Sequence, residues 1–469
     1  MMVLKDSIMK KYIFICLAVL LLPISTSAQA LRGSYFFDSS IQRIKMNPAF
    51  SPRTNYVTVP VLGDLSFNIN SNIGVSNFVF PKNGELYTYL NQNVSTAEFL
   101  ALMPENPRIQ AGIDTDILGT GFYISNKDFI SFNIAERLDV NFNVPSELFV
   151  FLKDGMAKDT YNFNDFAIKQ NAYLQVSAGY KRDLGDVVPG LSIGANVKFL
   201  TGLLRADMRI NQASIYMSQD KWELTTDAEG IIYGKGIDVK AATEEGETDN
   251  IVIKGFGPAG FGFAVDLGAE YKLDLDIPVL DGINFSASVV DLGTIFYSEE
   301  YVTRLTSSGN AAFEGLNDIN EQFDIKGSLK RITADFMALA DFEEAPLGDT
   351  RLNKSLTPKA YVGVEAPMLN NLMSFGLLYS YMYGINEITA SYNLKVKDIF
   401  NVGVNYSFLN NAKTVGFLME FIPRNGVAIF LGTDYMNLQY TPQGFPVEKF
   451  VMNAKLGIQA TFGSKFIKK

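Results

Sequence analysis

The sequence predicts an all-β protein, a transmembrane antiparallel β-barrel of about 14 strands with an N-terminal plug and long capping loops. Three features predict it: an export signal, long stretches in which apolar and polar residues alternate, and no later apolar run of 18 or more residues. Without such a run, a chain crosses a membrane only as a closed sheet, because a closed sheet pairs every backbone group.

The first residues have the order of a secretory signal peptide. Lys10 and Lys11 precede the apolar run 12–22, which is followed by Pro23 and the small residues of 25–30. A membrane-spanning helix needs about 20 apolar residues, so this run is too short to be an anchor. We therefore expect residues 1–28 to be removed by cleavage after Ala28, with Ala30 as the alternative site. Met9 is an alternative translation start.

Alternation of apolar and polar residues defines the strands. In 130–144, 401–408 and 452–462 every second residue is apolar, with Glu136 as an exception, and the residues between are mainly Asn, Ser, Gly, Gln and Thr. Tilted membrane strands of about 9–11 residues have this pattern, with the apolar side toward lipid. Strands are expected to begin near residues 115, 129, 171, 191, 211, 259, 283, 358, 373, 385, 399, 414, 426 and 451.

The expected domain division follows from these strands. Residues 29–114 form the plug and a first loop, and residues 115–469 form the outer-membrane barrel. Segment 55–70 is either an additional strand or part of the plug, and the choice changes the parity of the strand count. The stretches 77–114, 227–250 and 298–357 lack strand patterning and are expected to be capping loops or small helices.

Four charged residues are expected to face the lumen: Arg137, Asp139, Asp266 and Glu270. Paired carboxylates inside a barrel are compatible with hydrolysis. A network that braces the barrel is the favoured interpretation, because any polar lumen contains such groups.

Several functions are excluded or disfavoured by composition. The chain has no His, and its single cysteine, Cys16, lies within the signal. Imidazole and thiolate chemistry are therefore absent after cleavage, and we expect no catalytic residue, no metal site, no cofactor and no enzyme activity. The formal net charge is −10 without basic blocks, so no nucleic-acid partner is expected.

Two motifs carry a resemblance to a known family. Asn47-Pro48-Ala49 follows the expected cleavage site by about twenty residues, and a Gly-Phe-Gly strand runs into Asp266-Leu267-Gly268, echoed by Asp291-Leu292-Gly293. The chain resembles the FadL-type superfamily and its PorV-like relatives common in Bacteroidota. The resemblance implies that Asn47, Pro48 and Ala49 belong to a hatch inside the barrel. The Asp-Leu-Gly motifs are expected to be turns at strand ends.

Two functions remain open. The first is passive uptake of a hydrophobic or amphiphilic small molecule, which leaves through the wall or past the hatch; it predicts an apolar pocket inside the mouth. The second is a PorV-like barrel that docks partner proteins in an envelope secretion or assembly machine, since long loops offer a binding surface. Both place the protein among outer-membrane lipids of a Gram-negative cell.

Overall fold

The structure is a computed structural model. It describes residues 31–82, 84–155, 158–217, 222–240, 250–253, 257–277, 279–313, 343–382, 385–396, 399–409, 413–436 and 449–463. Within these residues, no helix is long and apolar enough to cross a membrane.

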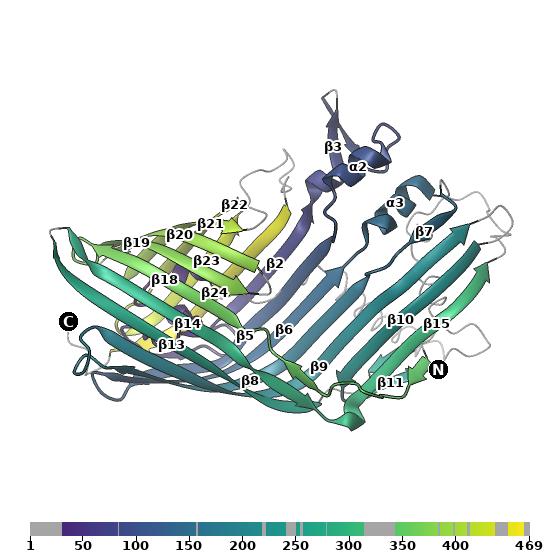
Figure 1. Ribbon diagram of the computed structural model, residues 1–469. Helices are drawn as coiled ribbons and strands as arrows, with labels where there is room; N and C mark the ends of the chain where they lie inside the picture. The colour runs from purple at the N-terminus through teal and green to yellow at the C-terminus, as the bar shows by residue number, and fades with distance from the viewer. Residues whose placement is uncertain are drawn as a thin grey trace, which may run out of the picture.

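The strands close into an antiparallel barrel of 14 strands (Figure 1), which confirms the predicted fold class. β24 pairs with β23 on one side and with β1 and β2 on the other, and this pairing closes the ring. The strands of the ring are β1 (Asn55–Thr58), β2 (Leu65–Gly74), β5 (Arg108–Tyr123), β6 (Asp128–Asn143), β8 (Ala167–Asp183), β9 (Leu191–Met217), β10 (Trp222–Gly234), β13 (Gly260–Ile277), β14 (Leu280–Tyr297), β15 (Val302–Phe313), β16 (Glu343–Ala345), β17 (Asn353–Ser355), β18 (Lys359–Met368), β19 (Met373–Met382), β20 (Ile385–Val396), β21 (Phe400–Leu409), β22 (Lys413–Phe421), β23 (Gly426–Met436) and β24 (Lys449–Phe462).

Several labelled strands are pieces of one barrel strand. β10 and β13 lie end to end along β9, since Gly234 pairs with Leu204 and Gly260 with Gly202. The chain leaves the wall between them, where it forms the hairpin of β11 (Ile237–Lys240) and β12 (Asn250–Ile253). β14 continues into β15 after the short helix η5 (Glu299–Tyr301). β1 with β2, and β16 with β17 and β18, form single barrel strands in the same way.

The predicted strand count of about 14 is right, although two of its parts differ from the structure. The strands expected near 191 and 211 are one 27-residue strand, β9. Segment 55–70, for which the sequence leaves strand and plug as alternatives, is a barrel strand and restores the count of 14. The barrel therefore begins at Asn55 and not at residue 115. The stretches predicted as loops contain strand residues 108–114, 227–234 and 302–313, because charged, glycine and polar residues interrupt the apolar alternation there.

The outer face of the barrel is apolar and the inner face is polar. In β19, Phe375 and Leu377 are each 53% exposed, whereas Ser374 and Ser380 between the outward positions are buried. The same alternation places Phe199 and Phe263 outside and Lys198 and Ala264 inside. A closed sheet with an apolar exterior and a polar interior is the architecture of outer-membrane proteins, so this chain is an outer-membrane β-barrel.

The two rims of the barrel differ. At the turn rim, β1 begins opposite the end of β24, and short connections such as 124–127 and 369–372 join the strands. The described long connections, 75–107 and 144–166, lie at the opposite rim and build what we call the crown: η3 (Val75–Asn77), β3 (Val79–Lys82), β4 (Glu85–Thr88), α2 (Thr96–Leu102), α3 (Ser146–Asp154) and β7 (Thr160–Asn162). Since periplasmic turns are short and extracellular loops long, the crown faces the cell exterior.

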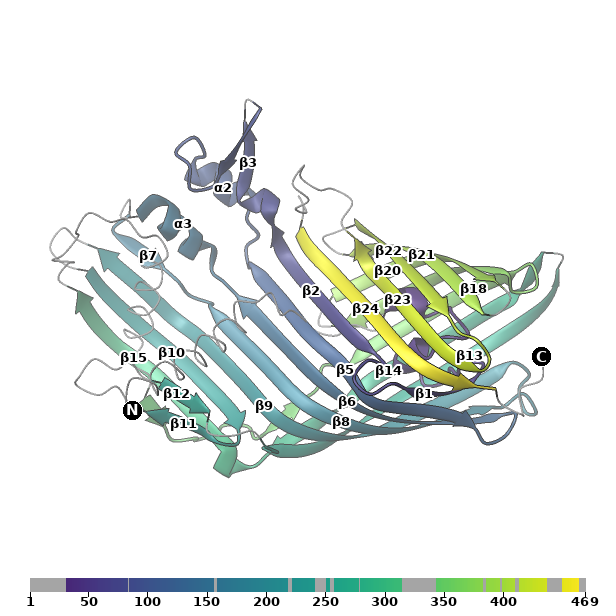
Figure 2. The ribbon, with the colours of Figure 1, turned by 180° about the vertical axis from the view of Figure 1, so that it is seen from behind.

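One side of the barrel is taller than the other, as Figures 1 and 2 show. β5, β6, β8 and β9 have 16 to 27 residues, whereas β18 to β23 have 9 to 12. The upper inner face of the tall side is polar: Gln212 pairs with Asp227 and Ser214 with Thr225, on the same face of β10 as Tyr233. The opposite face of β9 carries Ala213, Ile215 and Met217, which are buried against the crown on the rim of this side.

Candidate functional site: the plugged lumen

Residues 31–54, the plug, lie inside the barrel (Figure 2). They contain the short 3-10 helices η1 (Arg32–Ser34) and η2 (Gln42–Lys45), and most of their side chains are buried. The aromatic rings of Tyr35 and Phe50 pack edge to face, with centroids 5.0 Å apart, and join Tyr361 of β18 in one cluster. The plug is therefore packed against the wall as a protein core is packed.

Asn47-Pro48-Ala49 forms a buried turn against β13 and β14. The Asn47 Oδ1 atom accepts a hydrogen bond of 2.9 Å from the Ala49 N–H, and its Nδ2 donates to the carbonyls of Ala269 (3.2 Å) and Ala287 (3.4 Å). The hydroxyl of Ser288 donates to the Met46 carbonyl at 2.6 Å. These bonds satisfy polar groups that burial takes away from water.

The turn rests on two glycines that face each other across neighbouring strands, Gly194 of β9 and Gly268 of β13. A Cβ atom on Gly268 would lie 2.0 Å from Asn47 Oδ1, and one on Gly194 would lie 2.0 Å from the Pro48 carbonyl oxygen. Gly268 was expected at a turn, but it lies inside β13, as Gly293 lies inside β14. Glycine is required inside β13 because a larger side chain at Gly268 would leave no room for the plug.

Arg32 attaches the start of the plug to the short side of the barrel. Its guanidinium lies 2.9 Å from Glu387 of β20 and 4.0 Å from Asp434 of β23, and it also contacts the Tyr435 hydroxyl. The backbone N–H groups of Arg32 and Gly33 donate to the two Asp434 oxygens at 2.7 and 2.8 Å. All of these groups are buried, so each charge depends on its partner.

Two further basic residues attach the plug to the tall side. Arg43 lies 3.4 Å from Glu270 of β13 and stacks over the Phe50 ring at 3.6 Å. The Lys45 ammonium lies 2.7 Å from Asp116 of β5 and also contacts Asp64, between β1 and β2. Burial alone would lower the pKa of Lys45, but Asp116 and Asp64 raise it above its usual value. Lys45 is therefore held in its charged form.

Asp38 is the one acidic residue of the plug. Its carboxylate contacts Arg53, accepts a hydrogen bond from Asn371 at 3.0 Å and lies 3.7 Å from the Lys395 ammonium. Burial would raise its pKa, but Lys395 and Arg53 together hold the pKa well below its usual range.

Above η2 lies a polar chamber of about 70 Å³. It is lined mainly by charged and amide side chains, among them Lys45, Asp116, Arg137, Lys198, Asp266 and Asp291. The Lys198 ammonium bridges Asp266 at 2.7 Å and Asp291 at 2.5 Å. A space of this size and polarity holds ordered water in proteins. The apolar pocket expected for a hydrophobic ligand is therefore not what this chamber provides.

The chamber carboxylates lie at irregular points of the wall. Asp116 is at a register shift in β5, and Asp266 faces a shift between β13 and β14. Asp291, on the other strand of that shift, has a φ of 63°, which is uncommon for a residue other than glycine. Bulges turn side chains away from the regular pleat and are frequent at functional sites.

The structure brings three of the four sequence-predicted charges into contact with other charges. Arg137 pairs with Asp114, Asp266 with Lys198 and Glu270 with Arg43. Asp139 lies higher on β6 and accepts a hydrogen bond of 3.5 Å from Asn171.

Sequence reasoning missed Arg32, Arg43, Lys45 and the glycine pair. The pattern that could have identified the three cations is their place before the Asn47-Pro48-Ala49 motif, where basic residues outnumber acidic ones. No local pattern distinguishes Gly194 from other strand glycines.

An apolar patch, the wall cluster, covers the inner face above the chamber. Its members meet where β10 and β14 are interrupted, and they are Tyr173, Leu200, Tyr233, Ala259, Ala264, Ile295, Tyr297, Val302 and Leu356. The Tyr233 and Tyr297 rings lie 4.9 Å apart. The Tyr297 hydroxyl is buried and has no hydrogen-bond partner among the described residues. The wall cluster is thus a packed apolar core, whose members are at most 8% exposed, with one buried polar group that has no partner among the described residues.

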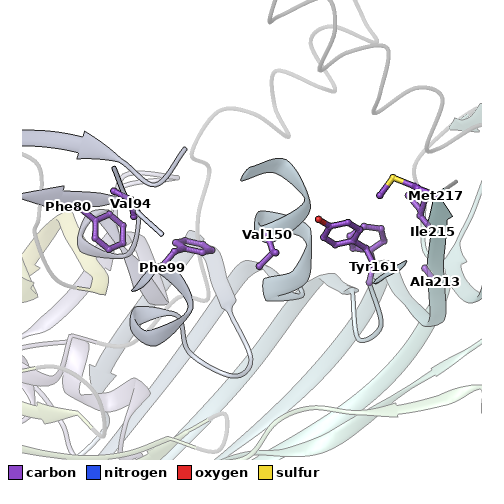
Figure 3. Close-up of a cluster of buried hydrophobic side chains, with 9 residues drawn as sticks. Phe80, Val94, Phe99, Val150, Tyr161, Ala213, Ile215 and Met217 are labelled. Carbon is purple, nitrogen blue, oxygen red and sulfur yellow. The ribbon is translucent and has the colours of Figure 1, made fainter. Parts of the chain in front are cut away.

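The crown has an aromatic core of its own (Figure 3). Phe99 of α2 stacks on Tyr89 with centroids 4.8 Å apart, and Val150 of α3 lies between this group and Tyr161 of β7. Ile215 and Met217 of β9 complete the core against the tall wall. The crown is therefore a packed cap fixed to the tall side.

Among the described residues, no group of three acidic, His or Cys side chains could hold a metal ion.

Comparisons with known proteins give a family and distant structural neighbours. The model described as "Family of unknown function (DUF5723)" matches residues 48–434. No curated protein matches the sequence. The toluene transporter TodX of P. putida is 11% identical over 90% of this chain and 94% of its own, with a TM-score of 0.40.

The toluene transporter TbuX of Ralstonia pickettii is 8% identical over 91% of this chain and 94% of its own, with a TM-score of 0.36. A FadL homologue of Pseudomonas aeruginosa is 10% identical over 95% and 99%, with a TM-score of 0.40. At this distance, the neighbours carry no argument about what this chain does.

Proposed function

Because the chain belongs to the Family of unknown function (DUF5723), whose description names no activity, we propose a function from the barrel itself: uptake of small amphiphilic molecules across the outer membrane. The single observation that carries the proposal is the amphipathic lumen. An apolar wall cluster lies directly above a polar chamber, and the plug lies inside the barrel below them.

Each part of this lumen suits one part of an amphiphile. The apolar portion gains about 25 cal/mol per Å² of buried apolar surface by inserting among the wall-cluster side chains, which are at most 8% exposed and must part to admit it. The Tyr297 hydroxyl and the chamber supply polar partners for a head group, which a purely apolar site would leave unsatisfied. A fully apolar solute would lose free energy on entering the polar chamber. Such a solute would therefore leave sideways through the barrel wall and not along the barrel axis.

The test is uptake of a fluorescent alkylamine and a fluorescent fatty acid by Gram-negative cells that produce the protein. We expect faster initial uptake of at least one probe than in cells without it. Tyr297→Ala should reduce the gain, because it removes the ring and the free hydroxyl from the wall cluster. Phe263→Ala is the matched control, since this ring is 60% exposed on the outer face. Equal uptake with and without the protein would refute the proposal.

A docking role is the second candidate, and the crown is the observation that favours it. Leu86, Leu90 and Leu102 are 51–55% exposed above the membrane, where lipid does not cover them. Apolar side chains exposed to water are frequent in protein-binding surfaces. Purification from membranes after crosslinking should then recover a partner protein in fixed ratio, and Leu86→Ser with Leu90→Ser should abolish its recovery.

A further inference from the structure

The plug and the wall have opposite charge. Within residues 31–54, four basic residues stand against one acidic residue, Asp38. Arg53 pairs with Asp38 inside the plug, which leaves Arg32, Arg43 and Lys45 to face the wall.

Each of these three cations meets carboxylates from a different part of the wall. Arg32 binds Glu387 and Asp434 on the short side. Arg43 binds Glu270, and Lys45 binds Asp116 together with Asp64, all on or beside the tall side. The one reversed contact is Asp38 with Lys395, and Lys395 already has a wall partner, Glu365, at 3.2 Å.

Two wall cations share a carboxylate with the plug, since Lys455 lies 3.1 Å from Asp64 and Lys272 lies 3.7 Å from Glu270. Others pair with further carboxylates. Lys198 lies between Asp266 and Asp291, and Arg137 contacts Asp114. Among the described residues, Glu387 and Asp434 form ion pairs with Arg32 alone, and Asp116 with Lys45 alone. If the plug left its place, these carboxylates would remain in the lumen without a cation.

Removing one partner of a buried ion pair is strongly destabilising, because the other charge stays buried without compensation. A lumen whose free charges share one sign also concentrates ions of the opposite sign. The vacated wall would therefore recruit positive charge, whether from the returning plug or from a solute.

We infer that the inner wall is an acidic binding site for an extended organic cation, that the plug occupies this site as an internal ligand, and that the open lumen selects positively charged solutes. The inference rests on the proposed function in taking the lumen as the route, and it adds that the favoured amphiphile is cationic. Amine or guanidinium groups on a flexible chain reproduce the chemistry of Arg32, Arg43 and Lys45.

The test is ion conduction by the full chain in planar bilayers. Arg32→Gln, Arg43→Gln and Lys45→Gln combined should convert a mostly closed channel into one that opens often. In a KCl gradient the open state should favour K⁺ over Cl⁻ by about tenfold. Spermidine, a flexible tricationic probe, should block the current at low concentration.

Two further variants keep the test decisive. Lys45→Gln alone, at a side chain that is 20% exposed, should assemble normally and give a smaller increase in opening. Lys127→Gln removes a lysine of the turn rim that pairs with Asp186 outside the lumen, and it should behave as wild type. An open state without preference, or with preference for Cl⁻, would overturn the inference, and so would folded variants that stay closed.

The result is separable from the uptake assay. K⁺ selectivity together with absent amphiphile uptake would leave the acidic site standing and remove only the proposed function. Faster uptake of the fatty acid than of the alkylamine would support uptake and count against a cationic ligand.

Discussion

Replacing Gly268 by alanine should loosen the plug without unfolding the barrel. The new Cβ atom would lie 2.0 Å from the Asn47 Oδ1 atom and 2.9 Å from the Pro48 Cδ atom. Ordinary contact begins at 3.4 Å, and β13 is fixed by its pairing with β9 and β14. The turn at Asn47-Pro48-Ala49 must therefore move, since it is the less constrained of the two parts.

The cost follows from the hydrogen bonds lost in this shift. Three bonds tie the turn to the wall: Asn47 Nδ2 to the carbonyls of Ala269 and Ala287, and the Ser288 hydroxyl to the Met46 carbonyl. At about 1 kcal/mol net for each bond, the plug loses about 3 kcal/mol of docking free energy. Because 1.4 kcal/mol corresponds to a factor of ten, the detached fraction should rise roughly a hundredfold.

The assay is labelling of a single cysteine in the plug. Cys16 is the only native cysteine, so it is changed to serine and Ser40, which is 1% exposed, is changed to cysteine. A membrane-impermeant maleimide should label this position slowly in the parent and about a hundred times faster with Gly268→Ala. Gly230→Ala is the control, because its Cβ would meet Met208 at an ordinary 3.5 Å.

Unchanged labelling in a Gly268→Ala barrel that is folded would refute the argument that the glycine pair seats the plug. Equal acceleration by Gly230→Ala would show that any added side chain loosens the barrel. Gly194→Ala should act like Gly268→Ala, because its Cβ meets the Pro48 carbonyl from the opposite strand.

Three further outcomes are expected. Arg32→Gln should lower the free energy of unfolding of the detergent-solubilised barrel by about 3–5 kcal/mol, since it leaves Glu387 and Asp434 buried without a cation. Plug docking, followed by the same cysteine labelling, should be constant near neutral pH and weaken below about pH 4. The pKa of Asp38 is depressed in the folded state, so its contribution is present above the unfolded pKa and is lost as pH falls toward the folded one. Phe99→Ala should loosen the crown by about 3–5 kcal/mol while the barrel persists, as limited proteolysis would show.

Each outcome has a matched comparison. Lys127→Gln, at an exposed ion pair, should change the stability by less than about 1 kcal/mol. Asp38→Asn should remove the acid weakening, and a persistent pH dependence would assign it to another group. Leu86→Ala, at a side chain that is 55% exposed, should leave the crown resistant to protease.

The barrel can be predicted from the sequence because the constraint on its strands acts on neighbouring residues and recurs in every strand. A strand between lipid and water must alternate apolar and polar residues, and 401–408 does so in a single short window. The same rule fails in the upper part of the tall side, where charged and polar residues within 205–212 interrupt the alternation. For this reason the sequence predicts loops for β15 and for residues 227–234, the lower part of β10, and it divides β9 into two strands at its polar middle.

The sequence by itself determined the closed antiparallel barrel, its approximate strand number, its polar interior and the absence of imidazole groups. Only the tertiary structure decided which charges meet, because Arg32 finds Glu387 and Asp434 more than 350 residues away. It also decided that Gly194 and Gly268 face each other beneath Asn47 and that Asp116 and Asp266 lie at wall irregularities. Alternation fixes the face on which a residue lies, whereas strand register and the path of the plug fix its partner.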